Sequence, residues 1–216
     1  MTNLIECKIV DILMSVYNMN YTDPCFNERY LHHYFTNKIQ ENYPIIFNDL
    51  NKSKLHPEWP TANHYRKEGG KYKKNGNMYK IDNSGWPGFI DFALGDYHNP
   101  KYGIEFKCTK SWNFQSIVFD YMKLMDSNNL LQKSMSFLII YRENKFSNRL
   151  NIDKINETIN ELINRLNERL EIKRPFLFWI IEISVKTKGI NSWYCNNLNE
   201  KFLSGIPKHT SLWCDL

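Results

Sequence analysis

Hydrophobic positions along this chain recur with two different periods, which together predict an alternation of helices and strands. Spacings of three and four residues predict four helices, over about residues 4–17, 24–40, 114–131 and 151–171. Short apolar runs predict four strands, over residues 89–94, 101–108, 135–141 and 176–185. The order helix, helix, hairpin, helix, strand, helix, strand is typical of an α/β fold with a mixed β-sheet flanked by α-helices.

The second helix is preceded by Thr22-Asp23-Pro24, which reads as a cap followed by proline at the first helical position. The first two strands are joined by residues 95–100, a Gly-Asp-Tyr-His-Asn-Pro stretch that is rich in turn formers. These two strands therefore form a β-hairpin.

A long polar segment from about residue 43 to 85 lies between the second helix and the hairpin, and part of it, about residues 60–82, is expected to be a basic loop. Its tyrosines are interspersed with six cationic residues, which are Arg66, Lys67, Lys71, Lys73, Lys74 and Lys80. Cations of this kind bind phosphates, and the tyrosines can stack on unpaired bases or pack against the sheet. The alternative is an ordinary solvated surface loop.

Length and composition narrow the class of protein. A chain of 216 residues with 42% hydrophobic and 24% charged residues indicates one globular domain, residues 1–216. No apolar run approaches the roughly 20 residues of a membrane span, and no secretion signal is visible, so we expect a cytoplasmic protein. The five cysteines contain no CxxC pair, which disfavours a zinc or iron–sulfur site. The net charge of +5 is compatible with an acidic polymer as partner.

The predicted hairpin carries the sharpest chemical signal. If its turn is centred on His98, Asp91 lies directly across from Glu105, and Lys107 shares the face of Glu105. Carboxylates paired across two strands stand about 5 Å apart and repel each other unless a cation lies between them. Magnesium is a natural occupant, because it prefers oxygen ligands.

Asp91, thirteen intervening residues and Glu105-Phe106-Lys107 form a pattern that resembles the PD-(D/E)XK nuclease superfamily. That superfamily includes restriction endonucleases, junction resolvases and many repair and defence nucleases. The resemblance implies a restriction-endonuclease-like fold in which Asp91 and Glu105 hold Mg²⁺, for which Mn²⁺ can substitute. It also implies that Lys107 assists the attacking water and that the carbonyl of Phe106 adds a ligand. The chain departs from the family motif in one position, because Ile90 stands where the motif has proline.

Members of this superfamily often add a glutamate from the N-terminal helix, and Glu28 is the candidate here. It lies in line with the apolar stripe of that helix, although the first turn of a helix also favours acids through the helix dipole. Some viral relatives bind Mn²⁺ through a helix histidine, which raises His32 as a second candidate; a satisfied or exposed histidine is the alternative.

Residues that follow the hairpin in the sequence are also candidates for contacts near the site. Lys110 and Gln115 follow the second strand, near the expected path of a phosphate backbone. On the helix after it, Asp120 and Lys123 are expected to form a surface ion pair at i, i+3 spacing.

The sequence thus favours a metal-dependent endonuclease that hydrolyses DNA phosphodiester bonds. A site-specific enzyme similar to type II restriction enzymes, acting on double-stranded DNA as a homodimer, is the leading expectation. The alternatives are a Holliday-junction resolvase, a mobile-element nuclease, an RNA endonuclease, or a non-catalytic nucleic-acid-binding module of the same fold.

Overall fold

The structure is a computed structural model of the whole chain, and its description covers most of the predicted elements. The described residues are 9, 11–15, 27–42, 54–67, 79–81, 86–110, 114–142, 152–166, 168–171, 173–184, 186–187, 189–196 and 201–207. Three helices have defined bounds: α2 (Glu28–Asn42), α3 (Phe114–Met125) and α4 (Ile152–Leu166). A short stretch before them, residues 11–15, is also helical.

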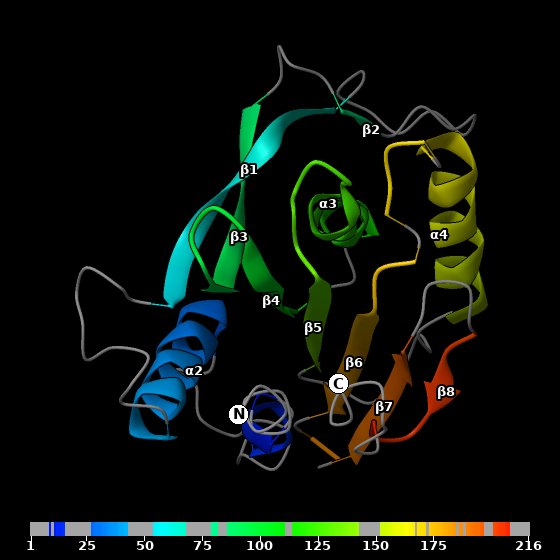
Figure 1. Cartoon of the computed structure of the whole chain (residues 1–216). Coiled ribbons are helices and arrows are strands. Elements are labelled where there is room, and N and C mark those ends of the chain that lie inside the picture. The colour runs from blue at the N-terminus through cyan, green and yellow to red at the C-terminus, as the bar shows by residue number, and fades with distance from the viewer. Residues whose placement is uncertain are drawn as a thin grey trace.

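The strands among the described residues form one eight-stranded sheet (Figure 1). They are β1 (Leu55–Lys67), β2 (Tyr79–Ile81), β3 (Trp86–Gly95), β4 (Pro100–Thr109), β5 (Lys133–Arg142), β6 (Phe176–Ser184), β7 (Gly189–Cys195) and β8 (Leu203–Ser204). Their order across the sheet is β2-β1-β3-β4-β5-β6-β7-β8. The neighbours β4, β5 and β6 are parallel, and every other pair is antiparallel.

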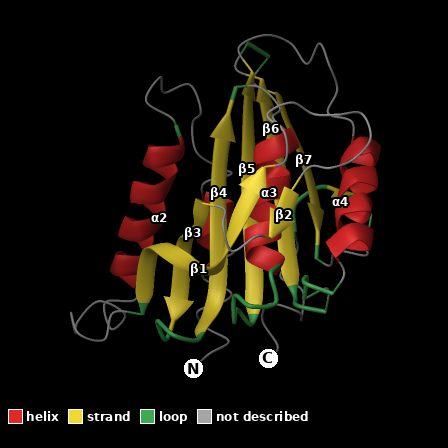
Figure 2. Cartoon of the chain, turned by 90° about the horizontal axis from the view of Figure 1, so that it is seen from above, coloured by secondary structure: helices red, strands yellow, loops and turns green. Residues whose placement is uncertain are grey.

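Helices cover both faces of this sheet. The α2 face is covered by α2 and the residue 11–15 helix, and the α3 face is covered by α3 and α4 (Figures 1 and 2). Because α3 and α4 carry the chain between parallel neighbours, β4 to β5 and β5 to β6, both pack on the same face of the sheet. The predicted α/β class, with a mixed sheet flanked by helices, is confirmed.

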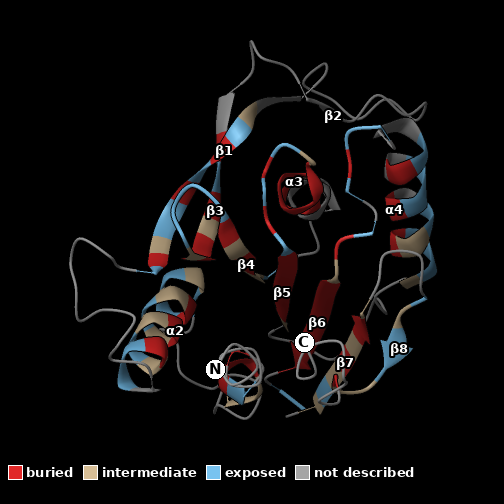
Figure 3. Cartoon of the chain, in the orientation of Figure 1, coloured by how far each residue is buried: buried red, intermediate tan, exposed pale blue. Residues whose placement is uncertain are grey.

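Each face has its own hydrophobic core. The α2 face buries Leu31, Phe35 and Ile39, which repeat along α2 at helical spacing. The α3 face buries Tyr121 and Met125 of α3. Figure 3 shows that burial concentrates in the central strands, and all nine residues of β6 are buried. A strand buried on both faces reads as a continuous apolar run, which is why β6 was predictable from the sequence.

The prediction of a loop before the hairpin was wrong in part. Residues 55–67, which include much of the polar segment, form the long strand β1, and residues 79–81 form the short strand β2. Strand β1 carries polar residues because Leu55 and Trp59 are its buried apolar anchors whereas Pro57 and Pro60 are exposed. The apolar spacing in β1 is therefore too sparse for the alternation that marks a strand.

Helix α3 ends six residues earlier than predicted, at Met125. The following turn is held by Arg174, which donates to the carbonyl oxygens of Leu124, Asp126 and Asn129. These bonds satisfy carbonyl groups at the end of the helix, which have no partner within it. The end of α3 is thus held by a residue almost fifty positions away in the sequence.

The start of α2 also differs from the predicted one. Asn27 caps the helix, since its side-chain oxygen accepts a hydrogen bond from the Tyr30 amide at 3.0 Å. The predicted cap at residues 22–24 and the predicted helix over residues 4–8 lie outside the described residues.

Candidate active site

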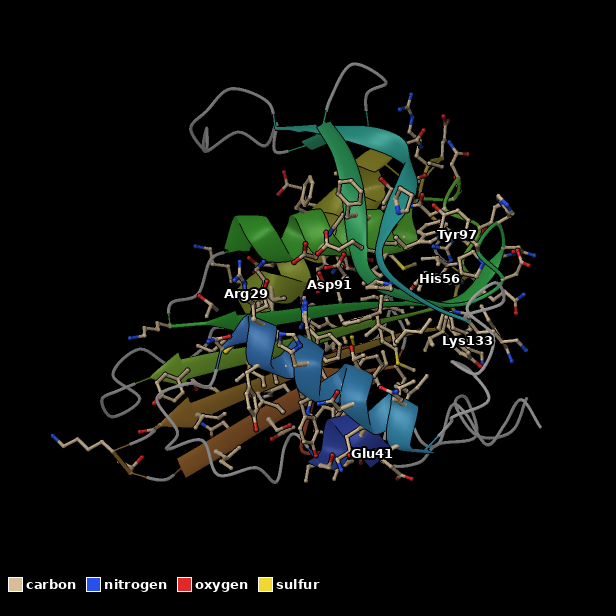
Figure 4. All side chains as sticks on the ribbon, turned by 90° about the vertical axis from the view of Figure 1, so that its left-hand side faces the viewer. Arg29, Glu41, His56, Asp91, Tyr97 and Lys133 are labelled. Atoms are coloured by element: carbon tan, nitrogen blue, oxygen red, sulfur yellow. The ribbon has the colours of Figure 1, made fainter. Side chains whose placement is uncertain are left out.

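The β3–β4 hairpin opens in its middle, and the candidate site lies where the two strands separate. The ladder pairs Leu94 with Tyr102 and Phe92 with Ile104, so that Asp91 and Glu105 occupy the next position on the diverging strands. There the Phe106 amide donates to Asp91 Oδ2 at 2.7 Å. In a regular ladder, a backbone carbonyl oxygen of the neighbouring strand accepts the hydrogen bond of such an amide. Here the side-chain carboxylate of Asp91 accepts it instead. Figure 4 shows Asp91 well away from Tyr97, which marks the turn end of the hairpin.

Strand β1 has an irregularity opposite Asp91. Its ladder with β3 pairs Trp59 with Ile90 and Pro57 with Phe92 but leaves out Glu58 and Asp91. Glu58 has a φ of 52°, in the left-handed region that residues with a Cβ rarely adopt.

Strand β3 changes its facing at the same point. Ile90 packs in the core of the α3 face, whereas Phe92 packs in the core of the α2 face. Strict alternation along a strand would place these two residues on one face, so the alternation of β3 breaks at Asp91. The Asp91 carboxylate thus lies at the position where the side chains of β3 change the face of the sheet on which they pack.

His32 approaches Asp91 from α2. Its Nε2 atom lies 3.3 Å from Asp91 Oδ2, yet this buried nitrogen is not aligned for a hydrogen bond. The imidazole packs edge-on to Phe92 and also contacts Phe106. Burial lowers the pKa of His32, but the Asp91 carboxylate outweighs it and raises that pKa above its ordinary value. Burial likewise raises the pKa of Asp91, but His32 and the Phe106 amide bring it below its usual range.

Glu105 pairs with a lysine of α3. Lys123 Nζ lies 2.5 Å from Glu105 Oε1, 3.1 Å from Asp120 Oδ1 and 2.7 Å from the carbonyl oxygen of Phe89. The three charged residues are buried. The predicted ion pair between Asp120 and Lys123 exists, but its placement on the surface was wrong, because α3 is enclosed between the sheet and α4.

The two carboxylates around this lysine hold protons more firmly than isolated ones. Burial raises the pKa of Glu105 well above its usual range, and the Asp120 charge raises it further. Burial also raises the pKa of Asp120. The pKa of Lys123 is raised as well, since the two acids outweigh the burial that lowers it. The ammonium thus remains charged and serves as the counter-ion of this buried acidic pair.

Lys107 and Glu28 meet at the open end of the gap. Lys107 Nζ lies 3.6 Å from Glu28 Oε2, and the same oxygen accepts a hydrogen bond from the Cys108 amide at 3.3 Å. Glu28 therefore reaches across to β4 instead of serving only the first turn of its own helix. Burial lowers the pKa of Lys107, but Asp120 and Glu28, followed by Asp91 and Glu105, raise it overall.

The structure thus brings together the four residues predicted to be catalytic, Asp91, Glu105, Lys107 and Glu28, with His32 beside them. Asp120 and Lys123 were missed as members of this group. A signal for them exists in the sequence, because residues 117–125 are apolar apart from these two charges. A helix that is apolar all round is buried, so charges within it must find partners inside the protein.

The residues expected to contact nucleic acid are only partly described. Lys110 is exposed directly after β4. Arg66 and Lys67 lie at the end of β1 and Gln115 lies in the first turn of α3, but their side chains are outside the description. Lys71, Lys73 and Lys74 lie outside the described residues altogether.

The donor chemistry fits a hard divalent cation. The gap between β3 and β4 collects the carboxylates of Asp91 and Glu105, with Glu28 at its open end, and the buried His32 nitrogen has no aligned hydrogen-bond partner. As the side chains stand, the part of the chain that is described contains no group of three or more His, Cys, Asp or Glu residues arranged to hold a metal ion. Phe106, whose carbonyl was expected as a further ligand, buries its ring in the core of the α2 face.

The chain matches no protein-family model, and no curated protein or solved structure matches it either. Its interpretation therefore rests on its own residues and geometry. Among the helices that the structure describes, none combines the length and the apolar character needed to cross a bilayer.

Proposed function

We propose that this protein is a metal-dependent endonuclease that hydrolyses DNA phosphodiester bonds, with a restriction-endonuclease-like fold. One observation carries the proposal: Asp91 and Glu105 occupy equivalent positions on two diverging strands, with Lys107 next to them on β4. A structural hairpin has no need to open its ladder around two acids. Asp91, Glu105 and Lys107 are also the residues on which the resemblance to the PD-(D/E)XK nucleases rests.

The acidic residues of the site would bind the metal, and Lys107 would act on the attacking water. Asp91 and Glu105 would hold Mg²⁺ or Mn²⁺, joined by Glu28 and by the carbonyl oxygen of Phe106. The bound metal supplies electrostatic stabilisation of the phosphate and activation of the attacking water. Lys107, whose raised pKa keeps it cationic, orients that water and balances the negative charge that develops on the phosphate.

His32 and the helix that carries it position Asp91. The imidazole lies against one oxygen of the carboxylate, and the Phe106 amide donates to the same oxygen. Both contacts fix the orientation of the carboxylate before any ligand arrives. Such preorganisation reduces the cost of assembling the site around a substrate.

The proposed substrate is double-stranded DNA, cut site-specifically by a homodimer. The exposed Lys110 and the cationic residues of the 60–82 segment, Arg66, Lys67, Lys71, Lys73 and Lys74 with Gln115 on α3, would follow the phosphate backbone. The alternatives of a Holliday-junction resolvase and an RNA endonuclease are outcomes that the experiment below distinguishes, whereas a mobile-element nuclease would share double-stranded DNA as its substrate.

The test compares plasmid DNA, genomic DNA, a four-way junction and a structured RNA after incubation with the purified chain and Mg²⁺. Glu105→Ala and Lys107→Ala are expected to lose cleavage, whereas wild-type protein loses it only when EDTA is added. Lys101→Ala is the matched control, because Lys101 lies on the same strand at its turn end. Discrete plasmid fragments indicate site specificity. Equal cleavage by all variants would refute the assignment of the site.

The rival function is a nucleic-acid-binding module without catalysis, and one observation favours it. Glu105, the expected ligand, is already neutralised by Lys123. Calorimetry with Mn²⁺ separates the two functions, because a bare binding module has no reason to bind the ion. Binding of Mn²⁺ that is lost in Glu105→Gln supports the nuclease, and DNA binding without any metal binding supports the module.

A further inference from the structure

The ammonium group of Lys123 lies in an environment made of oxygen atoms. Its neighbours are a carboxylate oxygen of Glu105, a carboxylate oxygen of Asp120 and the backbone carbonyl oxygen of Phe89, at 2.5, 3.1 and 2.7 Å. Two carboxylates and a carbonyl are also the donor types that Mg²⁺ and Mn²⁺ use in proteins. A side chain of the protein thus occupies a cation position.

We infer that Lys123 is a resident counter-ion, which a divalent cation has to displace from Glu105 in order to bind. The inference rests on the proposed function, since it concerns the same metal site. It assigns to Lys123 the role of setting how tightly the metal is held and of keeping the acidic pair neutralised in its absence.

Displacement follows because both cations would share the one carboxylate of Glu105. Magnesium binds a carboxylate oxygen at about 2.1 Å, and Lys123 Nζ already lies 2.5 Å from Glu105 Oε1. Two cations on neighbouring positions of a buried carboxylate repel each other in a medium of low dielectric constant. Glu105 is 3% exposed, so water cannot screen this repulsion.

The surroundings of Lys123 hold its backbone and leave its side chain a route outward. The Asn129 amide donates to the carbonyl oxygen of Lys123 at 2.7 Å, which fixes the backbone at this point. The ammonium lies 5.4 Å from the ring centroid of Phe119, which is only partly buried. Phe89, whose carbonyl oxygen it contacts, is 46% exposed. A rotation of the long lysine side chain can therefore bring the ammonium to solvent without unfolding α3.

The first experiment measures the reactivity of lysine side chains in the wild-type protein. The protein is labelled with an amine-reactive ester with and without saturating Mn²⁺, and labelling at each lysine is quantified by mass spectrometry. Lys123 is expected to gain about tenfold in labelling, because a buried amine that reaches water becomes accessible to the reagent. Lys38, on the surface of α2, and Lys133, buried on β5 opposite Tyr102, are internal references whose labelling should not change.

The second experiment removes the competing charge. Lys123→Met keeps the length of the side chain and is expected to bind Mn²⁺ about tenfold more tightly in calorimetry, because the repelling charge is gone. Lys38→Met removes one positive charge from a remote surface pair and is expected to leave the affinity unchanged. Because Lys123→Met leaves two buried acids unpaired, the double variant Asp120→Asn/Lys123→Met is measured beside it, with one acid and one cation removed together.

The outcomes separate this inference from the proposed function. If wild-type protein and both Lys123 variants give no heat with Mn²⁺, the metal-dependent function fails. If wild-type protein binds Mn²⁺ but the labelling of Lys123 does not change, the resident counter-ion is refuted and the nuclease stands. Equal or weaker Mn²⁺ binding by the Lys123 variants would overturn it as well.

Discussion

The contact between His32 and Asp91 leads to a prediction that can be worked out in detail. His32→Asn removes the imidazole from the carboxylate and keeps a polar side chain on α2. His33→Asn is the matched control, because His33 is the next residue of the same helix and is exposed. The two substitutions change helix propensity alike, so their difference reports the contact with Asp91.

The magnitude follows from the geometry. Opposite charges 3.3 Å apart attract each other by about 5 kcal/mol at an effective dielectric constant of about 20. Much of this attraction is lost again, because both groups give up hydration when they are partly buried. The remaining coupling is comparable to a hydrogen bond between charged groups, about 1–2 kcal/mol. His32→Asn should therefore destabilise the metal-free protein by about this amount, and His33→Asn by a few tenths of a kcal/mol at most.

The effect depends on pH in a defined direction. The pKa of His32 is raised above its ordinary value of 6.5, so its contribution is complete below that pH and is lost as the pH rises through the raised pKa. The pKa of Asp91 is lowered from its ordinary value of 3.8, so its contribution is present above that pH and is lost as the pH falls through the lowered pKa. The coupling is therefore greatest between these two ordinary values and declines in alkaline solution.

The assay is urea unfolding of wild-type protein, His32→Asn, Asp91→Asn and the double variant, at pH 5.5 and pH 9 with EDTA present. The double-mutant cycle isolates the coupling between the two side chains. A coupling below about 0.3 kcal/mol at pH 5.5 would show that the 3.3 Å contact contributes nothing. A coupling that does not change between the two pH values would refute the assignment of charge to the imidazole.

Three further substitutions test the local geometry by thermal or urea unfolding. Glu58→Gly should stabilise the protein by about 0.5–1 kcal/mol, because glycine relieves the left-handed φ at some cost in chain entropy, whereas Glu58→Ala should not. Gly103→Ala should destabilise it by about 1–2 kcal/mol, because the new Cβ would lie 2.6 Å from Leu131 Cδ1 and force that side chain to move; an unchanged unfolding midpoint would contradict this. Arg174→Met should cost about 3 kcal/mol, because carbonyl oxygens in the last turn of α3 and just after it lose a buried donor, and a loss below about 1 kcal/mol would argue against its capping role.

The elements that the sequence predicted well are those whose apolar pattern is set by the core. Strands β3 to β6 lie within a few residues of their predicted bounds, because their buried side chains form continuous or alternating apolar runs. Strands β1 and β7 were missed, since the first carries prolines and polar residues and the second, Gly-Ile-Asn-Ser-Trp-Tyr-Cys, has no regular alternation of apolar and polar residues. Sheet neighbours, which the local pattern does not record, decide whether such segments form strands.

The candidate site was predictable in its strand residues and in Glu28 and His32 of α2, but not in the α3 residues Asp120 and Lys123. The spacing between Asp91 and Glu105 and the intervening turn were sufficient to place the two acids opposite each other on the hairpin. The positive φ of Glu58, on the strand beside Asp91, cannot be deduced from the residues of β3 or β4. The pairing of Lys123 with Glu105 depends on how α3 packs onto the sheet, which is a tertiary property.

The two outermost strands limit how two copies of this chain can associate. Strand β2 has three residues and strand β8 has two, so the outermost strands themselves present only a few backbone groups for further pairing. Short edge strands are one of the ways in which proteins prevent their sheets from joining edge to edge. A homodimer that places two sites on opposite DNA strands would gain few backbone hydrogen bonds by pairing these outermost strands, so we expect it to bury helix or loop surface instead.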